Sequence, residues 1–328
     1  MSARKPRVSV VIEGYNESLA LGSVDDTMAG LLAQDFPLGE VEVILVGSQA
    51  QAEEWDRTWG DGAPFFRVVS VAPAGAHYYA LKNEGARRAS ADILALTDSD
   101  ARPEPGWLAS LVDAIERGAD VSAGVTLFRG DAGLEPGHPL MQVAASISWG
   151  FVVGSARARR TIVPAGFLSH NVGFRAETFR CHPYRTDLGR TCAGTFLYEE
   201  LRASGARIVL QPSQRVAHAF SLAWWLLRLH RRFGYEVFLL RRLDGTRRHG
   251  WLDAIRMLEP VLTMLWHVTL DVPRWLRFGR VLGVSAGRRA LLLPAVVVMS
   301  LLARGGEMIG MVQTIATPQA MKRFAESN

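Results

Sequence analysis

The sequence predicts an α/β domain with a mostly parallel sheet, followed by a helical region. Short apolar, β-branched runs alternate with helical patterns through the first half of the chain. The chain has 328 residues, of which 48% are hydrophobic, so it is long enough for one large or two ordinary domains. From Ser221 onwards the sequence is rich in Trp, Leu, Phe and Arg at helical spacing. These features divide the chain into residues 1–220 and 221–328.

Buried strands and covering helices are expected to alternate in the first half, because the apolar runs are short and are separated by helical patterns. The expected strands are 8–12, 41–46, 66–71 and 93–97, and the expected helices are 18–34, 49–58 and 78–89. Such alternation is typical of a parallel sheet with helices on both faces. Ligands of such sheets bind beyond the carboxyl ends of the strands.

The elements that follow are less regular. A helix over 107–117 follows a Pro-Glu-Pro-Gly turn, and a helix over 195–204 ends before Gly205, its expected C-terminal cap. The other expected elements are strands at 120–128, 171–175, 207–210 and 215–219, and a Gly- and Pro-rich loop over 130–139.

The C-terminal region combines apolar helices with a positive charge. Residues 221–289 contain 13 Arg against 5 Asp and Glu, whereas residues 1–220 carry a net charge of −4. Helices are expected within 222–243, 255–270 and 290–303. We interpret 221–328 as helices that lie on or dip into a membrane surface, with arginines at the headgroups.

Two alternatives remain for this region. It can form a purely soluble helical subdomain with apolar core faces. It can also contain a spanning pair over about 290–316, which Arg304 and Glu307 would interrupt. A solvated basic face would account for the charge alone. Nucleic-acid binding is disfavoured, because the richness of the segment in Trp and Leu suits lipid better, so we expect no nucleic-acid partner.

Composition also restricts the compartment and the chemistry. Two cysteines, Cys181 and Cys192, are too few for a disulfide framework, which favours a reduced, cytosolic setting. The first apolar run ends after five residues, so we expect no signal peptide. A hydride-transfer enzyme is disfavoured, because no G-x-G-x-x-G follows the first strand.

Two carboxylates follow the fourth expected strand, in Asp98-Ser99-Asp100. Ionised carboxylates this close repel each other unless a cation or hydrogen-bond donors lie between them. A hard divalent cation such as Mg²⁺ or Mn²⁺ suits oxygen ligands and keeps positions open for substrate phosphates. The pair therefore suggests a site that clamps a metal ion and a diphosphate.

Four segments extend this suggestion. They are VSVVIEGYNE (8–17), ALKNEGARRASADILALTDSD (80–100), HNVGFRAETF (170–179) and PSQRVAH (212–218). In this order they resemble the family 2 inverting glycosyltransferases of the GT-A fold, over about residues 6–220. The resemblance implies a GT-A-type mixed, mostly parallel sheet. It also implies metal-assisted transfer of one sugar from a nucleotide-diphosphate sugar, with Mn²⁺ or Mg²⁺.

The resemblance also implies roles for individual residues. Nucleotide-sugar binding is expected of Gly14, Tyr15, Asn16, Glu17, Ser48, Asn83, Arg87 and Asp98, and metal binding of Asp98, Asp100 and His218. His170 is interpreted as an ordinary hydrogen-bonded histidine.

Two acidic motifs of the family are absent. The second strand ends in Leu45-Val46-Gly47-Ser48, where the family usually has acids that include the one reading the base. The acidic pair with the catalytic base falls on Ala193-Gly194, which leaves Glu199 and Asp187 as candidate bases. The alternative function is therefore a catalytically degenerate nucleotide-sugar-binding or scaffold protein.

The expected partners follow from these features. The donor is a nucleotide sugar, and the basic, aromatic helices favour a lipid-linked or amphipathic acceptor at the cytoplasmic face of a membrane. Residues 229–233 read Leu-His-Arg-Arg-Phe, where processive relatives carry Gln-x-x-Arg-Trp, so processive synthesis is not expected.

Overall fold

The computed structural model forms two compact units. The first comprises Met1–Leu127 and Val152–Ala219, and the second Phe128–Phe151 and Phe220–Asn328. The division after Ala219 lies next to the expected boundary, and the segment Phe128–Phe151 groups with the C-terminal helices. The structure describes residues 5–16, 23–60, 62–74, 77–130, 134–154, 164–187, 190, 192–243 and 254–326.

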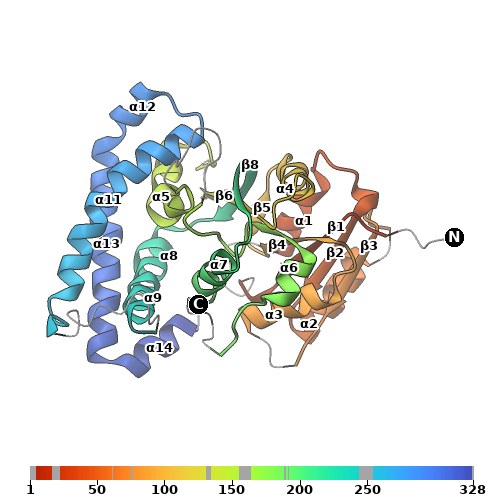
Figure 1. The fold of residues 1–328 in the computed structure, drawn as a ribbon, viewed down its shortest axis with the longest axis horizontal. Coiled ribbons are helices and arrows are strands. Elements are labelled where there is room, and N and C mark those ends of the chain that lie inside the picture. The colour runs from red at the N-terminus through yellow and green to blue at the C-terminus, as the bar shows by residue number, and fades with distance from the viewer. Residues whose placement is uncertain are drawn as a thin grey trace. The chain divides into compact units, whose positions relative to one another are not determined.

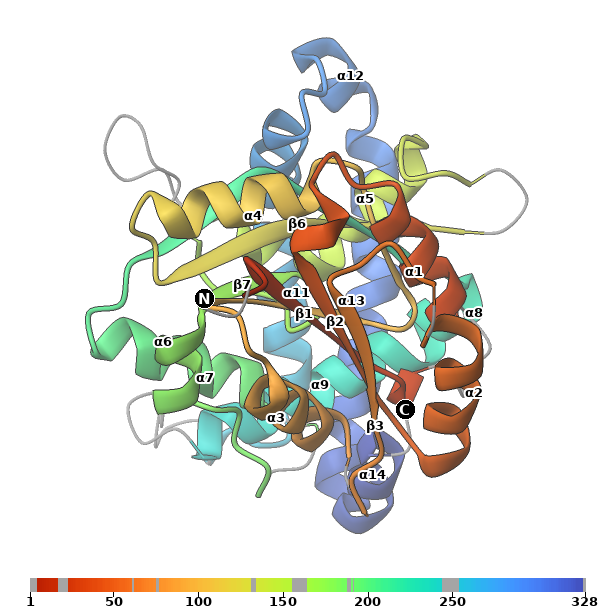
Figure 2. The ribbon, with the colours of Figure 1, turned by 90° about the vertical axis from the view of Figure 1, so that its right-hand side faces the viewer.

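The described strands form one eight-stranded mixed sheet in the order β3-β2-β1-β4-β7-β6-β8-β5 (Figure 1). The strands are β1 (Val8–Glu13), β2 (Val41–Val46), β3 (Arg67–Val71), β4 (Ile93–Asp98), β5 (Ala101–Pro103), β6 (Val121–Arg129), β7 (Val172–Arg175) and β8 (Ile208–Ala219). The first four strands pair in parallel, and β7 pairs antiparallel with both β4 and β6. Figure 2 shows β1, β2 and β3 side by side. The sheet is thus parallel from β3 to β4, and the pairs β4–β7, β7–β6 and β8–β5 beyond it are antiparallel. This mixed sheet with its flanking helices confirms the predicted fold class.

Helices of the first unit connect these strands. They are α1 (Val24–Leu32), η2 (Leu38–Glu40, a 3₁₀ turn), α2 (Gln49–Trp59), α3 (Tyr78–Arg88), α4 (Trp107–Glu116), α6 (Ala176–Cys181) and α7 (Ala193–Ala203). The first helix begins after the Ser23 cap, whose side chain accepts a bond from the Asp26 N–H, rather than at residue 18. Residues 17–22 lie outside the described part of the chain. The two predicted pieces at 207–210 and 215–219 are one continuous strand, β8.

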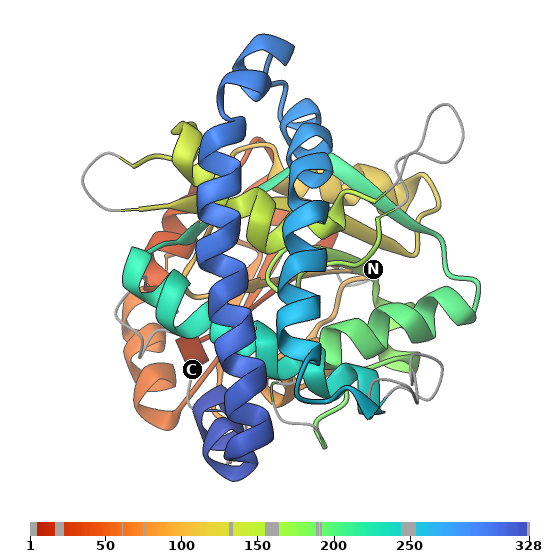
Figure 3. The ribbon, with the colours of Figure 1, turned by 90° about the vertical axis from the view of Figure 1, so that its left-hand side faces the viewer.

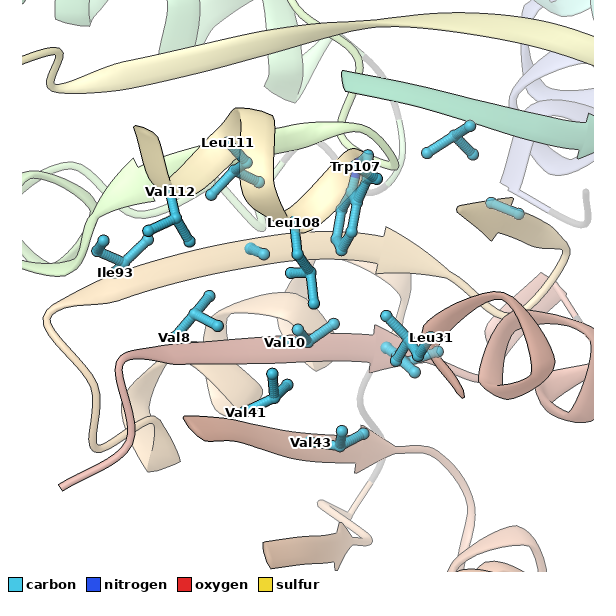
Figure 4. Close-up of a cluster of buried hydrophobic side chains, with 14 of the residues drawn as sticks. Val8, Val10, Leu31, Val41, Val43, Ile93, Trp107, Leu108, Leu111 and Val112 are labelled. Atoms are coloured by element: carbon cyan, nitrogen blue, oxygen red, sulfur yellow. The ribbon is translucent and has the colours of Figure 1, made fainter. Parts of the chain in front are cut away.

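Alternation along the strands assigns each side chain to one face of the sheet. On one face Val8 and Val10 lie in a core cluster with residues of α1 and α4, and Figure 4 shows Leu108 of α4 directed at Val10. The other face lies against α3, where a Cβ at Gly85 would collide with Val11. The polar residues that end β1 and β4 continue this α3 face.

The second unit consists mainly of helices. They are α5 (Pro139–Trp149), η3 (Gly150–Val152), α8 (Leu222–Trp224), η4 (Trp225–Leu229, a π-helical turn), α9 (His230–Leu243), α11 (Glu259–Val281), α12 (Ala286–Leu291), α13 (Leu293–Ala316) and α14 (Pro318–Glu326). Helix α5 has no counterpart in the sequence prediction. Figure 3 shows α11 and α13 side by side along most of their length.

Glycines allow α9 and α13 to pack with their backbones in contact. A Cβ at Gly234 would collide with the carbonyl oxygen of Glu307, and a Cβ at Gly310 with that of Arg231. Gly306 and Gly310 are four residues apart on α13 and so lie on one side of that helix. Small residues at this spacing let two helices approach closely.

A network of buried charged groups joins the same helices. Arg304 of α13 is 4% exposed and donates to both carboxylate oxygens of Asp271, each at 2.8 Å, to Glu307, and to the carbonyl oxygen of Ile147 at 2.8 Å. Glu307 also contacts the ring of His267 at 2.8 Å. Arg304 and Glu307, which interrupt the apolar run of the sequence, are therefore paired inside the second unit.

The outward side of this helix pair is apolar. Within the described residues, α13 is the one helix whose length and composition would let it cross a membrane, and 44% of its most apolar window is buried. Large apolar side chains remain exposed on both helices: Val261, Leu262, Leu265 and Trp266 on α11, and Val297, Val298, Leu301, Leu302, Ile309 and Val312 on α13. We call these ten residues the α11/α13 apolar face.

Candidate active site

The carboxyl ends of β1 and β4 bring two acidic side chains together. Glu13 ends β1, Asp98 ends β4, and the strand register pairs them directly. Both belong to the α3 face, because Val11 precedes Glu13 by two residues and Leu96 precedes Asp98 by two. Glu13 is 0% exposed and Asp98 is 1% exposed. Burying two carboxylates side by side requires compensating partners.

Asp98 receives these partners from α3 and from the loop after β1. Lys82 donates to Asp98 Oδ1 and, at 2.9 Å, to the carbonyl oxygen of Thr97. The Tyr78 hydroxyl donates to Asp98 Oδ2 at 2.8 Å, and Asn16 Nδ2 donates to the same oxygen at 3.0 Å. Burial alone would raise the pKa of Asp98, but the charge of Lys82, followed by that of His170, lowers it to about 2. Asp98 is therefore ionised at neutral pH.

Two histidines complete a cluster with metal-binding geometry. One ligand atom from each of Asp98, His170 and His218 lies within 4.8 Å of the other two, and all three residues are buried. His170 precedes β7, which pairs with β4, and His218 lies on β8. The Nδ1 atom of His218 lies 2.9 Å from the carbonyl oxygen of Ala219. A carbonyl only accepts, so Nδ1 donates and Nε2 carries the lone pair that a metal ion needs.

The carboxylate of Asp100 lies beside this cluster. Its Oδ2 is 3.4 Å from His218 Nε2, and Asn16 Nδ2 donates to its Oδ1 at 3.4 Å. Burial raises the pKa of Asp100, and the neighbouring His218 opposes that rise. The donor set of one carboxylate and two imidazoles, with a second carboxylate adjacent, suits a divalent cation that takes both oxygen and nitrogen ligands, such as Mn²⁺.

A second cation, Arg190, lies on the aromatic rings of the site. Its guanidinium is 4.3 Å from the ring centroid of Tyr78 and 5.0 Å from that of Tyr15. Arg190 Nη2 donates to Asn16 Oδ1 at 2.9 Å. Its Nη1 is buried and has no hydrogen-bond partner among the described residues. Arg190 therefore places a charged N–H donor, for which the described residues offer no acceptor, at the edge of the sheet where Glu13 and Asp98 lie.

The remaining predicted binding residues lie around this centre or have local roles. Gly14 accepts from Gln51 Nε2 at 3.0 Å through its carbonyl, and Tyr15 donates its N–H to Glu13 Oε2 at 2.7 Å. Ser48 forms the capping box of α2 with Gln51. Glu17 lies outside the described residues.

Two predicted contacts on α3 have partners within the protein. Asn83 donates to the carbonyl oxygen of Tyr184 at 2.8 Å and accepts from its N–H at 3.0 Å. Arg87 is exposed and pairs with Glu84. In the described structure Asn83 fixes the segment that leads towards Arg190, and Arg87 lies on the helix surface.

The two candidate bases also have neighbours of their own. Asp187 is exposed and forms a two-pronged ion pair with Arg185, with distances of 3.1 and 2.6 Å. Glu199 lies on α7 and pairs with Arg202 at 2.7 Å. Asp187 is three positions from Arg190, whose side chain lies in the site, whereas Glu199 is in the interior of a helix.

Sequence patterns alone did not identify several residues of the site. The cluster includes His170, which had been interpreted as an ordinary histidine, and the centre also contains Glu13, Tyr78, Lys82 and Arg190. The sequence did contain a signal for two of them. Glu13 ends an otherwise apolar strand, and His170 is the first residue of the family-like segment 170–179. The others are recognised only from the packing of α3 and of the segment before α7.

Comparison with known proteins agrees with this geometry. The glycosyl transferase family 2 model matches residues 9–181, more than half of the chain. Glycosyltransferase AglE of Haloferax volcanii is 25% identical over 259 residues, which cover 69% of this chain and 82% of that protein. A glucosyl-dolichyl phosphate glucuronosyltransferase of the same organism is 32% identical over 120 residues, 36% of each chain.

A solved structure supports the fold. The mannosyltransferase PcManGT of Pyrobaculum calidifontis, determined in complex with GDP-Man and Mn²⁺, is similar over 97% of this chain and 89% of its own. Its TM-score is 0.55 at 17% sequence identity, a likeness of fold alone. Asn16, Asp98 and His170 lie within the matched residues 9–181. The chain belongs to glycosyl transferase family 2.

Proposed function

We propose that this glycosyltransferase moves one sugar from a nucleotide-diphosphate sugar to an acceptor hydroxyl or phosphate, with the help of a divalent metal ion and with inversion at the anomeric carbon. The observation that carries the proposal is the convergence of Asp98, His170 and His218 at the carboxyl edge of the sheet. Ligands of α/β sheets bind at this edge. The mannosyltransferase of similar fold, whose structure contains GDP-Man and Mn²⁺, supports it.

The cluster would hold the metal ion, and Asp100 would complete or orient its ligands. Such an ion supplies neutralisation of the negative charge that develops on the diphosphate leaving group. Asp98 is held ionised by Lys82, so its carboxylate is ready to bind a cation at neutral pH. Asn16 bridges Asp98 and Asp100 and keeps the two carboxylates in fixed positions.

Arg190 would add a second positive contact to the diphosphate. Its Nη2 donates to Asn16, and its Nη1, which has no partner among the residues that the structure describes, is a charged donor beside the cluster. A guanidinium binds phosphate oxygens strongly and with defined geometry. We assign Arg190 to the binding of the leaving group.

Asp187 is the better placed of the two candidate bases. It belongs to the same short segment as Arg190, whereas Glu199 is in the interior of α7 and pairs with Arg202. Breaking the exposed pair with Arg185 costs little, so Asp187 can turn towards an acceptor. With an acceptor whose reacting group is a hydroxyl, we expect D187N to lower kcat by at least about 100-fold, the scale of general-base catalysis, and E199Q to leave it nearly unchanged. The reverse order of effects would assign the base to Glu199.

The acceptor is proposed to be lipid-linked and the second unit to bind the membrane. The α11/α13 apolar face carries ten exposed apolar side chains, and arginines follow at the ends of α11 and α12. Apolar side chains flanked by arginines suit the boundary between acyl chains and anionic headgroups, which we place at the cytoplasmic leaflet. A relative named for a dolichyl phosphate substrate supports this choice. We expect W266D to reduce binding to anionic vesicles and R277M, on the same helix, to reduce it less.

The first experiment is calorimetric titration of the full chain with UDP, GDP, CDP and dTDP, with and without Mn²⁺. Tight binding of one nucleotide that requires Mn²⁺ supports the proposed site and identifies the nucleotide. The H170A variant should lose the Mn²⁺ requirement together with the affinity. If none of the four nucleotides binds, the metal–diphosphate assignment is wrong.

The same protein then decides between transfer and binding alone. Polyprenyl phosphate in detergent and the matching nucleotide sugar are the substrates, and release of the nucleoside diphosphate is the readout. Donor binding without transfer to any acceptor would favour the degenerate, binding-only function, which the absence of an acid at Ala193 and Gly194 makes worth testing.

A further inference from the structure

Glu13 has a buried carboxylate oxygen to which none of the described residues donates a hydrogen bond. Its side chain is 0% exposed. Oε2 accepts the backbone N–H of Tyr15 at 2.7 Å, whereas Oε1 has no hydrogen-bond partner among the described residues. A buried acceptor without a donor costs free energy, and native proteins usually satisfy such atoms. An unsatisfied oxygen at the edge of a binding site therefore indicates where a ligand group belongs.

The position of Glu13 along the edge of the sheet identifies the part of the ligand. Strand register places it between Val46 of β2 and Asp98 of β4. Neighbouring strands are about 4.8 Å apart, so Glu13 is one strand spacing from the metal cluster, on the side of β2. A nucleoside diphosphate whose phosphates lie at the cluster extends its nucleoside across β1.

The chemistry of that ligand restricts the contact further. Ionised phosphates only accept hydrogen bonds, so they offer nothing to a carboxylate oxygen. The ribose hydroxyls are the first donors beyond the diphosphate along the nucleotide. Burial, followed by the charge of Asp98, raises the pKa of Glu13 well above its usual range, and a hydroxyl that donates to Oε1 would favour the ionised form of this side chain.

The end of β2 leaves no room for an acid of its own. A Cβ at Gly47 would lie 2.5 Å from Cη2 of Trp55, and a Cβ at Gly14 would lie at the same distance from that atom. The indole of Trp55 thus fills the space that a side chain at the start of this loop would need. Strand register places Glu13 directly beside Val46, the last residue of β2.

We propose that Glu13 accepts a hydrogen bond from a ribose hydroxyl of the donor nucleotide and so selects ribonucleotides over deoxyribonucleotides. This role rests on the proposed function, because it places a nucleoside diphosphate at the cluster. It adds a specificity residue on β1 that senses the sugar of the nucleotide rather than its phosphates.

The test compares nucleotides that differ by one hydroxyl, in the full chain with Mn²⁺. The wild type first identifies which of UDP, GDP and CDP binds. That nucleotide is then titrated beside its 2′-deoxy and 3′-deoxy analogues against wild type, E13A and E13Q. Loss of the contacted hydroxyl should weaken binding to the wild type by about tenfold or more, and to E13A by about twofold or less.

A matched control separates this contact from general damage. Glu42 is also a fully buried glutamate in the sheet, but Ser9, Ser90 and Arg67 satisfy its carboxylate. E42Q should retain the wild-type discrimination between ribose and deoxyribose. E13Q keeps the volume of the side chain and a weaker acceptor, so it should show intermediate discrimination even where E13A folds poorly.

Each outcome bears on the assignment. If E13A and E13Q discriminate against both deoxy analogues as strongly as the wild type does, Glu13 does not contact the ribose. If these variants instead change the preference among UDP, GDP and CDP, the contact is with the base and the ribose assignment is wrong. Failure of the wild type to bind any nucleotide would overturn the proposed function as well, which distinguishes it from the first two results.

Discussion

Replacing Arg304 with methionine should destabilise the second unit strongly, because it leaves two buried carboxylates without their main cation. Arg304 donates to Asp271, Glu307 and the carbonyl oxygen of Ile147. Asp271 and Glu307 are 1% and 2% exposed, so water cannot replace the guanidinium. Methionine has a similar length and apolar stem, so the change removes mainly charge and hydrogen bonds.

The expected loss is about 3–5 kcal/mol of unfolding free energy, the range measured when one partner of a buried ion pair is removed. This is a large part of the roughly 5–15 kcal/mol that stabilises a typical domain. His230 and His267 also contact Glu307, and these remaining contacts limit the loss. An exposed arginine on α11, Arg277, has no such role, and R277M should cost less than about 0.5 kcal/mol.

Urea unfolding followed by tryptophan fluorescence measures these values, because Trp225 and Trp275 are both 0% exposed in the second unit. A double-mutant cycle adds E307Q. In the R304M background E307Q should cost much less than in the wild type, because it removes a carboxylate that has lost its partner. A cost below about 1 kcal/mol for R304M, or strictly additive effects in the cycle, would refute this account of the network.

Three further predictions concern single residues. H170A should weaken Mn²⁺ binding by at least about tenfold in calorimetry, whereas H182A, which removes only a contact with Glu200, should not. R190A should raise the KM of the nucleotide sugar more than R190K does, because lysine keeps the positive charge but lacks the paired N–H donors of a guanidinium. Equal effects of the two substitutions would contradict the diphosphate contact. Burial would raise the pKa of Glu307, but the charge of Arg304 lowers it well below the ordinary value of a glutamate. The folded pKa lies below the unfolded one, so this stabilisation is complete above about pH 4.5 and is lost as the pH falls further. E307Q should flatten that part of the acid limb in urea unfolding, and an unchanged limb would contradict it.

The strands of the first unit are readable from the sequence for a simple physical reason. Strands buried on both faces are mostly apolar, and β1, β2 and β4 are so apart from Ser9, Glu42 and the polar residues that end β1 and β4. The rule that ligands bind at the carboxyl edge then directs attention to Asn16 and Asp98. This much of the site follows from local patterns.

The rest of the site depends on contacts between distant segments. Lys82 meets Asp98 because α3 lies across the face to which Asp98 points, and His170 meets it because β7 pairs with β4. Helix α5 was missed for a related reason. Eight of its eleven residues are buried, so it shows no polar face with helical periodicity; the remaining signal was Pro139 at its first turn.

The contact between α9 and α13 bears on the stability of the second unit in the proposed membrane-bound state. In water, the hydrophobic effect of burying apolar side chains holds most helix pairs together. This driving force is absent in lipid. Here Gly234 and Gly310 let main chain touch main chain, and such van der Waals contact does not depend on the surrounding solvent. A unit assembled in this way can meet an acyl environment on one side and keep its shape, so that membrane attachment need not be accompanied by refolding.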